Sequence, residues 1–117
     1  GHSLGAHVIL STIKNLAKNT KNKGIIEAVY LFGGSIPSDA LSAKNASYVQ
    51  KIVSKKIRNY YSPHDEVLHV VDDWNWVNTP IGYKGAHGKT IPKYSQTMVK
   101  PKNHRFASYA AVLRSFP

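Results

Sequence analysis

The chain has 117 residues, of which 42% are hydrophobic, and it contains no cysteine. This composition is typical of one globular domain or a piece of one. It excludes a disordered chain, a disulfide-stabilised scaffold and a zinc site built on cysteines. No stretch reaches the roughly 18 consecutive apolar residues that a membrane-spanning helix needs.

The formal net charge is +10, and the lysines are scattered with only modest clusters, as at Lys51, Lys55 and Lys56. A solvated basic face explains this pattern, and attraction to an anionic membrane surface or to nucleic acid is the alternative. We expect no nucleic-acid partner, because the basic residues lack the interleaved aromatic side chains of a single-strand binding platform.

The chain opens with Gly1-His2-Ser3-Leu4-Gly5, a Gly-x-Ser-x-Gly pentapeptide. In such a motif the serine occupies a strained turn between a strand and a helix, small residues let neighbouring backbone pack closely, and the hydroxyl is left exposed above the sheet. The motif alone also fits a flexible N-terminal loop. However, apolar residues recur at helical spacing over residues 4–17 and give way to a polar stretch at 19–24. This pattern predicts the helix that the motif requires.

The following segments predict alternating strands and helices. Residues 25–32 are mostly apolar, β-branched and aromatic, and Gly33-Gly34 closes the run, as expected of a strand buried on both faces of a parallel sheet. Residues 40–54 have loosely helical spacing, and residues 56–61 predict a second, more exposed strand.

In the last part of the chain, residues 67–74 predict a short helix and residues 75–93 show no period, so we expect an irregular excursion there. Residues 96–99 predict a short strand, and residues 105–116 a terminal helix. The order strand, helix, strand, helix implies right-handed crossovers and parallel pairing. The predicted fold class is therefore α/β.

In open α/β sheets, functional residues gather at the carboxyl ends of the strands. Asp65 follows the second predicted strand, and His104 lies just before the terminal helix. The chain order Ser3, Asp65, His104 is the order of the triad in α/β-hydrolases. In that chemistry Ser3 attacks a carbonyl carbon and His104 moves the proton, while Asp65 holds the imidazole. The backbone N–H of Leu4 donates to the oxyanion.

Each of these assignments has a rival. Asp65 is also placed to cap the next helix, and His2 is expected to pack or hydrogen-bond locally. The aromatic residues of the later segments line a substrate cleft or pack in the core. No histidine spacing indicates a metal site, and we expect no cofactor. The alternatives to Asp65 as the carboxylate are Glu66, Asp72 and Asp73, and the alternatives to His104 as the base are His64, His69 and His87. The aromatic residues for which a cleft or the core is open are Trp74, Trp76, Tyr83 and Tyr94.

The run Gly-His-Ser-Leu-Gly-Ala-His over residues 1–7 has the form common among lipases. Residues 29–37 and 59–68 more narrowly resemble the family of transmembrane and coiled-coil domain protein 4, which consists of hydrolase-like proteins. Residues 1–117 therefore resemble the C-terminal portion of a single lipase- or esterase-like α/β-hydrolase domain. The resemblance implies a serine hydrolase that cleaves ester or lipid-like substrates through an acyl-enzyme, with the triad Ser3, Asp65 and His104 and no metal.

The sequence departs from the family pattern in two ways. The strands that precede the serine motif are missing, and so is the loop that supplies the second oxyanion donor. Without its neighbour the first strand has an open apolar edge, so we expect an N-terminal half or another chain to complete the sheet. The alternative function is a non-catalytic α/β scaffold that binds a membrane surface or a partner protein.

Overall fold

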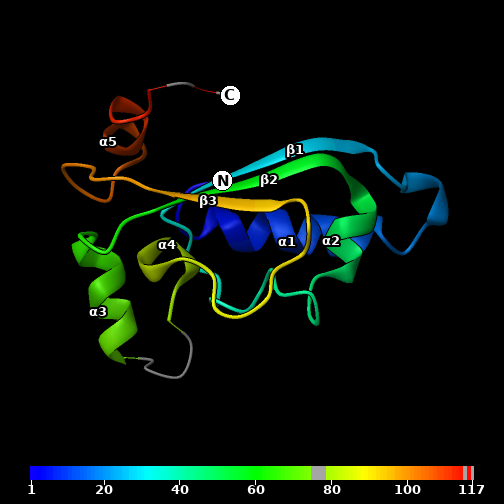
Figure 1. Cartoon of the computed structure of the whole chain (residues 1–117), viewed down its shortest axis with the longest axis horizontal. Helices are drawn as coiled ribbons and strands as arrows, with labels where there is room; N and C mark the ends of the chain where they lie inside the picture. The colour runs from blue at the N-terminus through cyan, green and yellow to red at the C-terminus, as the bar shows by residue number, and fades with distance from the viewer. Residues whose placement is uncertain (75–78, 115, 117) are drawn as a thin grey trace.

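The computed structural model describes the backbone of residues 1–74, 79–114 and 116, and the side chains of all of these except residues 71–74. Three parallel strands form one sheet in the order β1-β2-β3, namely β1 (Ile26–Phe32), β2 (Val53–Tyr61) and β3 (Tyr94–Met98). With helices on either side of the sheet, this is the α/β arrangement that the order of the elements predicted (Figure 1).

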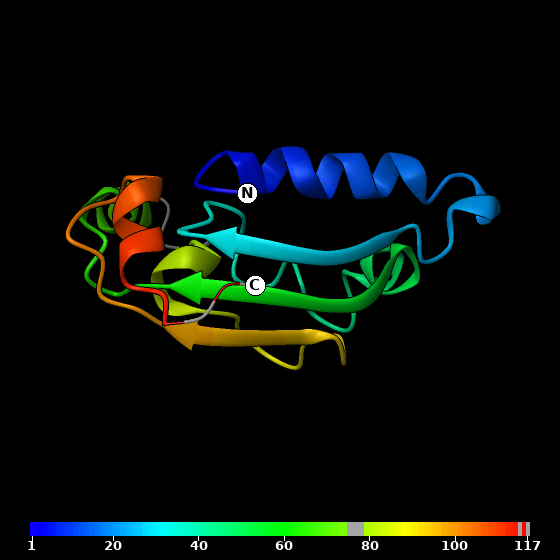
Figure 2. The same cartoon turned by 90° about the horizontal axis from the view of Figure 1, so that it is seen from above.

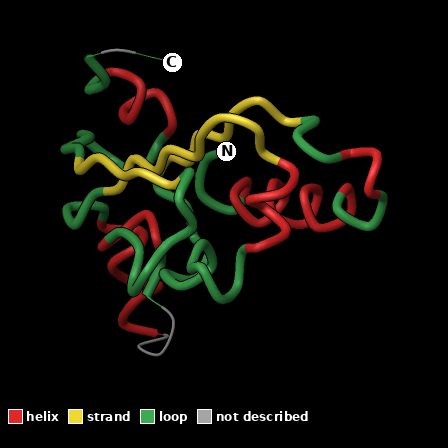
Figure 3. The backbone as a smooth tube through the Cα atoms, turned by 45° about the vertical axis from the view of Figure 1, so that its right-hand side comes forward, coloured by secondary structure: helices red, strands yellow, loops and turns green. Residues whose placement is uncertain are grey.

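The longest helix is α1 (Gly5–Leu16), which together with α2 (Ser47–Ile52) lies on one side of the sheet (Figure 1). Two elements gather near the carboxyl ends of the strands, α3 (Glu66–Trp74) and α5 (Phe106–Ala111) (Figure 2). In Figure 3 the strands run as one band, and α5 lies across that band from α1. The remaining elements are a short 3-10 turn, η1 (Thr20–Asn22), and a short helix, α4 (Ile81–Lys84).

The main core lies between the sheet and the helices of the α1 side. Val29 of β1 is paired with Ile57 of β2, which is paired in turn with Tyr94 of β3, so this row faces the core. A smaller cluster on the opposite face contains Phe32, Tyr60, Val99 and Tyr109. The buried residues of the main core are Ala6, Ile13, Val29, Leu31, Ile36, Leu41, Ala46, Val49, Ile52, Val53, Ile57, Ile81 and Ile91.

The helix predicted from residues 4–17 is present as α1, but two of its apolar residues do not join the core. Leu4 is 70% exposed and Val8 is 66% exposed. The reason is that α1 runs beside the free edge of β1, so part of its surface faces no neighbour among the described residues (Figure 2). The apolar stripe of α1 is therefore wider than its buried face.

The second strand is the central strand of the sheet, and the prediction that it is the more exposed one is wrong. It begins at Val53 and pairs with both other strands, and Ile57 and Asn59 are fully buried. Its charged residues Lys56 and Arg58 are partly exposed and alternate with the buried Ile57 and Asn59. In a strand, alternate residues face opposite sides, so a central strand can still carry charges on its open face.

The helix predicted over residues 40–54 is much shorter than expected. Only Ser47–Ile52 is helical, because the preceding residues pair with a distant segment. Ser42 forms an isolated antiparallel bridge with Thr90, and the N–H of Ile91 donates to the carbonyl of Leu41. These long-range bonds satisfy the backbone of the loop, and local periodicity does not reveal them.

Three further boundaries differ from the prediction. The segment expected to be irregular contains α4, β3 begins at Tyr94 instead of residue 96, and α5 ends at Ala111 instead of residue 116. The part of the irregular prediction at residues 75–78 lies outside the described residues. Within the described residues, none of the helices combines the length and the apolar character needed to cross a lipid bilayer.

Gly82 joins the loops that follow β1 and β2. Its N–H donates to the carbonyl of Gly34 at 2.9 Å, and its own carbonyl accepts from the N–H of Ser62 at 2.8 Å. A Cβ at Gly82 would lie 2.2 Å from the nitrogen of Gly34 and 2.3 Å from the carbonyl carbon of Gly33, both of which are backbone atoms. Only glycine fits this approach.

Gly82→Ala is therefore expected to lower the free energy of unfolding by about 3 kcal/mol, because backbone must move to admit the methyl group. Urea unfolding measures this change. Gly5→Ala is the matched control, since nothing lies within 4 Å of a Cβ at Gly5, and its effect should stay within about 1 kcal/mol. Equal losses in the two variants would contradict the close approach at Gly82.

Candidate active site

The serine motif is attached to the free edge of β1. The N–H of Phe32 donates to the carbonyl of Gly1 at 2.9 Å, and the N–H of Ser3 donates to the carbonyl of Phe32 at 3.1 Å. The terminal amine of Gly1 reaches the carbonyl of Tyr30 at 2.6 Å, and His2 and Phe32 form a parallel bridge. These bonds hold Ser3 at the carboxyl end of the sheet, immediately before α1.

Ser3 has a strained backbone. Its φ is +53°, and Ser3 is the one non-glycine residue with a positive φ within the described part of the chain. Such strain costs on the order of 1–3 kcal/mol and is typical of functional sites. The flanking glycines differ: a Cβ at Gly1 would lie 2.5 Å from Cδ1 of Ile9, whereas a Cβ at Gly5 would have nothing within 4 Å. The close packing expected of the motif therefore applies to Gly1 and not to Gly5.

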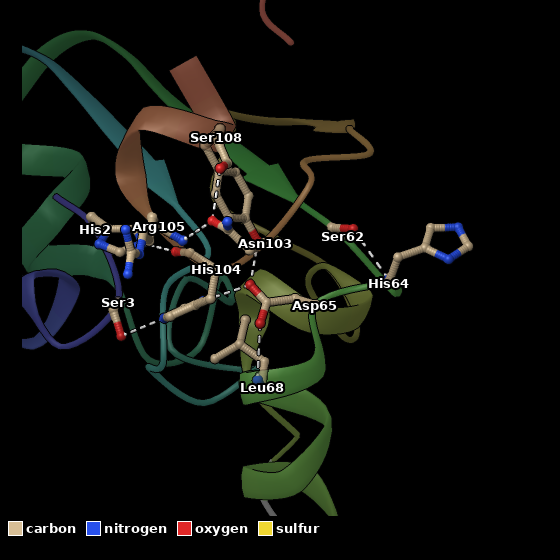
Figure 4. A network of polar contacts seen from close by, with 11 residues as sticks. His2, Ser3, Ser62, His64, Asp65, Leu68, Asn103, His104, Arg105 and Ser108 are labelled. Atoms are coloured by element: carbon tan, nitrogen blue, oxygen red, sulfur yellow. Dashed lines mark hydrogen bonds and ion pairs between the residues drawn. The ribbon is translucent and has the colours of Figure 1, made fainter. Parts of the chain in front are cut away.

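The structure brings Ser3, His104 and Asp65 together in a hydrogen-bonded chain (Figure 4). Nδ1 of His104 lies 2.5 Å from Oδ2 of Asp65, and Nε2 lies 2.9 Å from Oγ of Ser3. A carboxylate only accepts, so the imidazole proton belongs on Nδ1. Nε2 is then free to accept from the serine hydroxyl.

Asp65 makes both of the contacts that the sequence left open. Its Oδ1 accepts from the backbone N–H of Leu68 at 3.0 Å, which caps α3, while its Oδ2 accepts from His104. The residue is only 2% exposed. Its neighbour Glu66 is exposed, and the side chains of Asp72 and Asp73 lie outside the described residues.

The other histidines are placed elsewhere. His64 is exposed and its ring points away from the site (Figure 4). The ring of His69 contacts the hydroxyl of Tyr83 at 2.7 Å, and His87 is exposed in the loop before β3. The loop that carries His104 is fixed by Asn103, whose Oδ1 accepts from the N–H of Arg105 and the hydroxyl of Ser108.

Leu4 is the candidate oxyanion donor. It follows Ser3 directly and is the N-cap residue of α1. Its backbone N–H donates to no acceptor within the described part of the chain. An N–H at a helix N-terminus favours developing negative charge, so the group suits a tetrahedral oxyanion.

Sequence reasoning missed Tyr109, whose hydroxyl donates to Oδ2 of Asp65 at 2.5 Å. Tyr109 is fully buried, and burial, followed by the nearby Asp65 carboxylate, raises its pKa well above the usual range for tyrosine. The only sequence signal was an aromatic residue within the apolar run of the last helix. His2, as expected, acts locally: its Nε2 donates to the backbone carbonyl of His104, and its ring lies 4.8 Å from the His104 ring.

Of the later aromatic residues, Tyr83 and Tyr94 are packed against neighbouring side chains, and each also lines a shallow surface pocket, which Tyr83 shares with Asp65. Tyr83 is buried, and the hydroxyl of Tyr94 contacts the amide of Asn59 at 2.8 Å. Burial raises the pKa of Tyr94 to about 12. The side chain of Trp74, and all of Trp76, lie outside the described residues. In the described part of the chain, no group of three or more His, Cys, Asp or Glu is arranged to hold a metal ion.

Comparisons with known proteins match part of the chain. Over 70 residues the chain is 33% identical to the "Transmembrane and coiled-coil domain-containing protein STS1" of Oryza sativa subsp. japonica. The match covers 60% of this chain and 10% of that protein, so the chain spans about a tenth of the length of this curated relative. No solved structure matches the chain. The family described as "Protein of unknown function (DUF726)" matches residues 1–81 of the 117, and the chain therefore belongs to this family.

Proposed function

We propose that the chain is the C-terminal portion of an α/β-hydrolase domain and that it cleaves ester bonds through an acyl-enzyme. The observation that carries the proposal is the hydrogen-bonded chain from Ser3 through His104 to Asp65, with Ser3 in a strained turn before a helix. The arrangement has the nucleophile, the base and the orienting carboxylate within the distances that acyl transfer requires.

In the first half-reaction, Oγ of Ser3 attacks the ester carbonyl carbon and its proton passes to Nε2 of His104, 2.9 Å away. The carbonyl oxygen becomes an oxyanion that accepts from the N–H of Leu4. The intermediate then collapses, the bond to the alcohol oxygen breaks, and His104 returns the proton to the leaving alcohol. The acyl group remains on Ser3.

In the second half-reaction, water attacks the acyl carbon while Nε2 of His104 takes its proton. The bond to Oγ of Ser3 breaks, the proton returns to the serine, and the carboxylic acid leaves. Asp65 stabilises the imidazolium in both halves and keeps the reactive tautomer in place.

Apolar surface beside the serine favours an ester with an apolar acyl or alcohol part. Leu4, which follows Ser3, is 70% exposed, and Phe106, two residues after His104, is 49% exposed. Both are large apolar side chains left uncovered among the described residues. A preference for lipids rests on the resemblance of the serine motif to that of lipases.

Ester turnover tests the proposal. With p-nitrophenyl esters of increasing chain length, we expect a burst of nitrophenol equal to the number of Ser3 sites, followed by slower steady release as the acyl-enzyme hydrolyses. An acyl mass on the peptide containing Ser3 would accompany the burst. Turnover equal to that of His104→Gln, with no acyl mass on that peptide, would contradict the proposal.

The free edge of β1 supports the finer assignment of the fold. On that side the strand pairs only with residues 1–3, at its carboxyl end, within the described chain. A groove of about 450 Å³ follows the rest of the edge and is lined by Val8, Ile9, Ile26 and Ala28, among others. Unpaired backbone beside apolar side chains favours the addition of another strand. We infer that a further strand, from the same protein or another copy, pairs here.

For the chain by itself, we expect concentration-dependent self-association through this edge, measured by sedimentation velocity. Val8→Lys should shift the chain toward monomer without unfolding it, because Val8 is 66% exposed and a lysine fits a helix surface. Lys14→Gln, on the same helix, serves as the control for changed charge. A folded monomer at every concentration would contradict an edge of β1 that is open to pairing with another strand.

A second candidate function rests on a basic groove on the other face of the sheet. Arg58, Lys100 and Arg114 line this groove, which also has a volume of about 450 Å³ and no carboxylate in its lining. Such a surface suits an anionic membrane. If the unaltered chain and Ser3→Ala bound phosphatidylserine vesicles equally while ester turnover by the unaltered chain stayed at background, this non-catalytic function would replace the hydrolase.

A further inference from the structure

The carboxylate of Asp65 has a second side-chain donor besides His104. The hydroxyl of Tyr109 and Nδ1 of His104 each lie 2.5 Å from the same oxygen, Oδ2, while Oδ1 is occupied by the N–H of Leu68. Two donors on one carboxylate oxygen share its negative charge. Each bond is therefore weaker than it would be alone.

The surroundings fix the position of this hydroxyl. Tyr109 is fully buried in α5, and a Cβ at Gly33 would lie 2.8 Å from its hydroxyl oxygen and 2.9 Å from Cζ. Gly33 also has a φ of +52°, which favours glycine. The rings of His2 and His104 meet the Tyr109 ring edge-on, with centroids 6.0 Å and 6.4 Å away. The tyrosine thus packs against the end of β1 and against the hydrogen-bonded chain Ser3–His104–Asp65, which we call the relay.

We propose that Tyr109 is a positioning residue of the relay. Its hydroxyl shares Oδ2 of Asp65, and this sharing limits how tightly the charged His104 ring holds the proton on Nε2. This inference rests on the proposed function, in which Nε2 of His104 must carry no proton before it can accept one from Ser3. With a weaker carboxylate acceptor the imidazolium is less stabilised. His104 then stays a competent base at a lower pH than it would beside an unshared carboxylate.

The other charged groups around His104 do not compete with it for Oδ2 of Asp65 among the described residues. Within the described part of the chain, the titratable or charged groups that contact His104 or adjoin it in sequence are Asp65, Tyr109, His2 and the exposed Arg105. His2 donates to the backbone carbonyl of His104, not to the carboxylate. Because burial raises the pKa of Tyr109, its hydroxyl keeps its proton and remains a donor at neutral pH. Tyr109 is the side chain that competes with His104 for Oδ2.

The test is an NMR titration of the His104 ring in the full chain, with the signal assigned by its loss in His104→Gln. In Tyr109→Phe we expect the titration midpoint to rise by roughly half to one pH unit, since a hydrogen bond to the charged acceptor is removed. Tyr60→Phe is the matched control. Tyr60 belongs to the same buried cluster, and its hydroxyl has no partner among the described residues.

A second variant protects the test against loss of folding. Site-specific 3-fluorotyrosine at position 109 keeps the ring and makes the hydroxyl a stronger donor, so it should lower the His104 midpoint. Opposite shifts in the two variants, with no shift in Tyr60→Phe, would support the inference. An unchanged midpoint in both Tyr109 variants, or equal shifts in Tyr60→Phe, would overturn it and leave Tyr109 a packing residue.

Failure of this inference is distinguishable from failure of the proposed function, because the titration needs no substrate. If the midpoint moves but the protein shows no Ser3-dependent turnover, the hydrolase proposal fails and the role of Tyr109 stands. If turnover depends on Ser3 but the midpoint does not move, the inference about Tyr109 fails and the hydrolase proposal stands. In the active protein, the midpoint of the acid limb of the kcat/KM profile should lie at a higher pH in Tyr109→Phe, by the same interval as the NMR titration midpoint.

Discussion

Ser3→Ala is expected to lower ester turnover by about 10⁴-fold or more, because the residue that forms the acyl-enzyme is lost. The fold should survive, since the contacts that hold the serine turn are backbone bonds from residues 1 and 3 to β1. Turnover of p-nitrophenyl esters measures the first effect, and circular dichroism with thermal unfolding measures the second.

Ser3→Gly separates the chemistry from the strain. It removes the same hydroxyl, but glycine accepts the φ of +53° at this position without a Cβ penalty. We expect it to be as inactive as Ser3→Ala and about 1 kcal/mol more stable than that variant. Wild-type turnover in either variant would remove Ser3 from the reaction, and equal stabilities would contradict a strained turn.

Asp65→Asn should reduce turnover by about 10⁴-fold and lower the free energy of unfolding by about 2–3 kcal/mol. The carboxylate accepts on both oxygens, from Leu68 on Oδ1 and from His104 and Tyr109 on Oδ2. An amide has one acceptor oxygen and an NH₂ group. Whichever way it turns, a donor faces a donor in a buried site.

Glu66→Gln is the matched control for this variant. Glu66 is the next residue, lies in the first turn of α3 and is exposed. Its change should leave turnover within about twofold and stability within about 0.5 kcal/mol, as expected of surface substitutions. If Asp65→Asn behaved like Glu66→Gln, the buried carboxylate would have no special role in orienting His104.

The elements with a strong local signal were predicted well. The 3.6-residue period gave α1, and the apolar run closed by two glycines gave β1, each to within about a residue. Failures came where distant segments decide the structure. Residues 41–43 pair with residues 89–91, and α4 is held against the loop after β1 by the glycines at 34 and 82. Such contacts leave no period in the sequence.

The candidate site was predicted in part, for a physical reason. Ser3, Asp65 and His104 follow from chain order and from the rule that strand ends meet at one edge of a sheet. The order of the residues does not tell that one carboxylate serves two tasks, with one oxygen capping α3 and the other holding the relay. Nor does it place the hydroxyl of Tyr109 on that second oxygen, because the contact joins residues 44 positions apart.

Labelling with a fluorophosphonate probe, followed by peptide mapping, tests the serine nucleophile most directly. The probe reacts with a serine only when a neighbouring base has activated it. We expect one adduct, on Oγ of Ser3, which disappears in His104→Gln and after denaturation of the protein. A folded protein that remains unlabelled, beside an active control hydrolase that is labelled, would contradict a serine hydrolase.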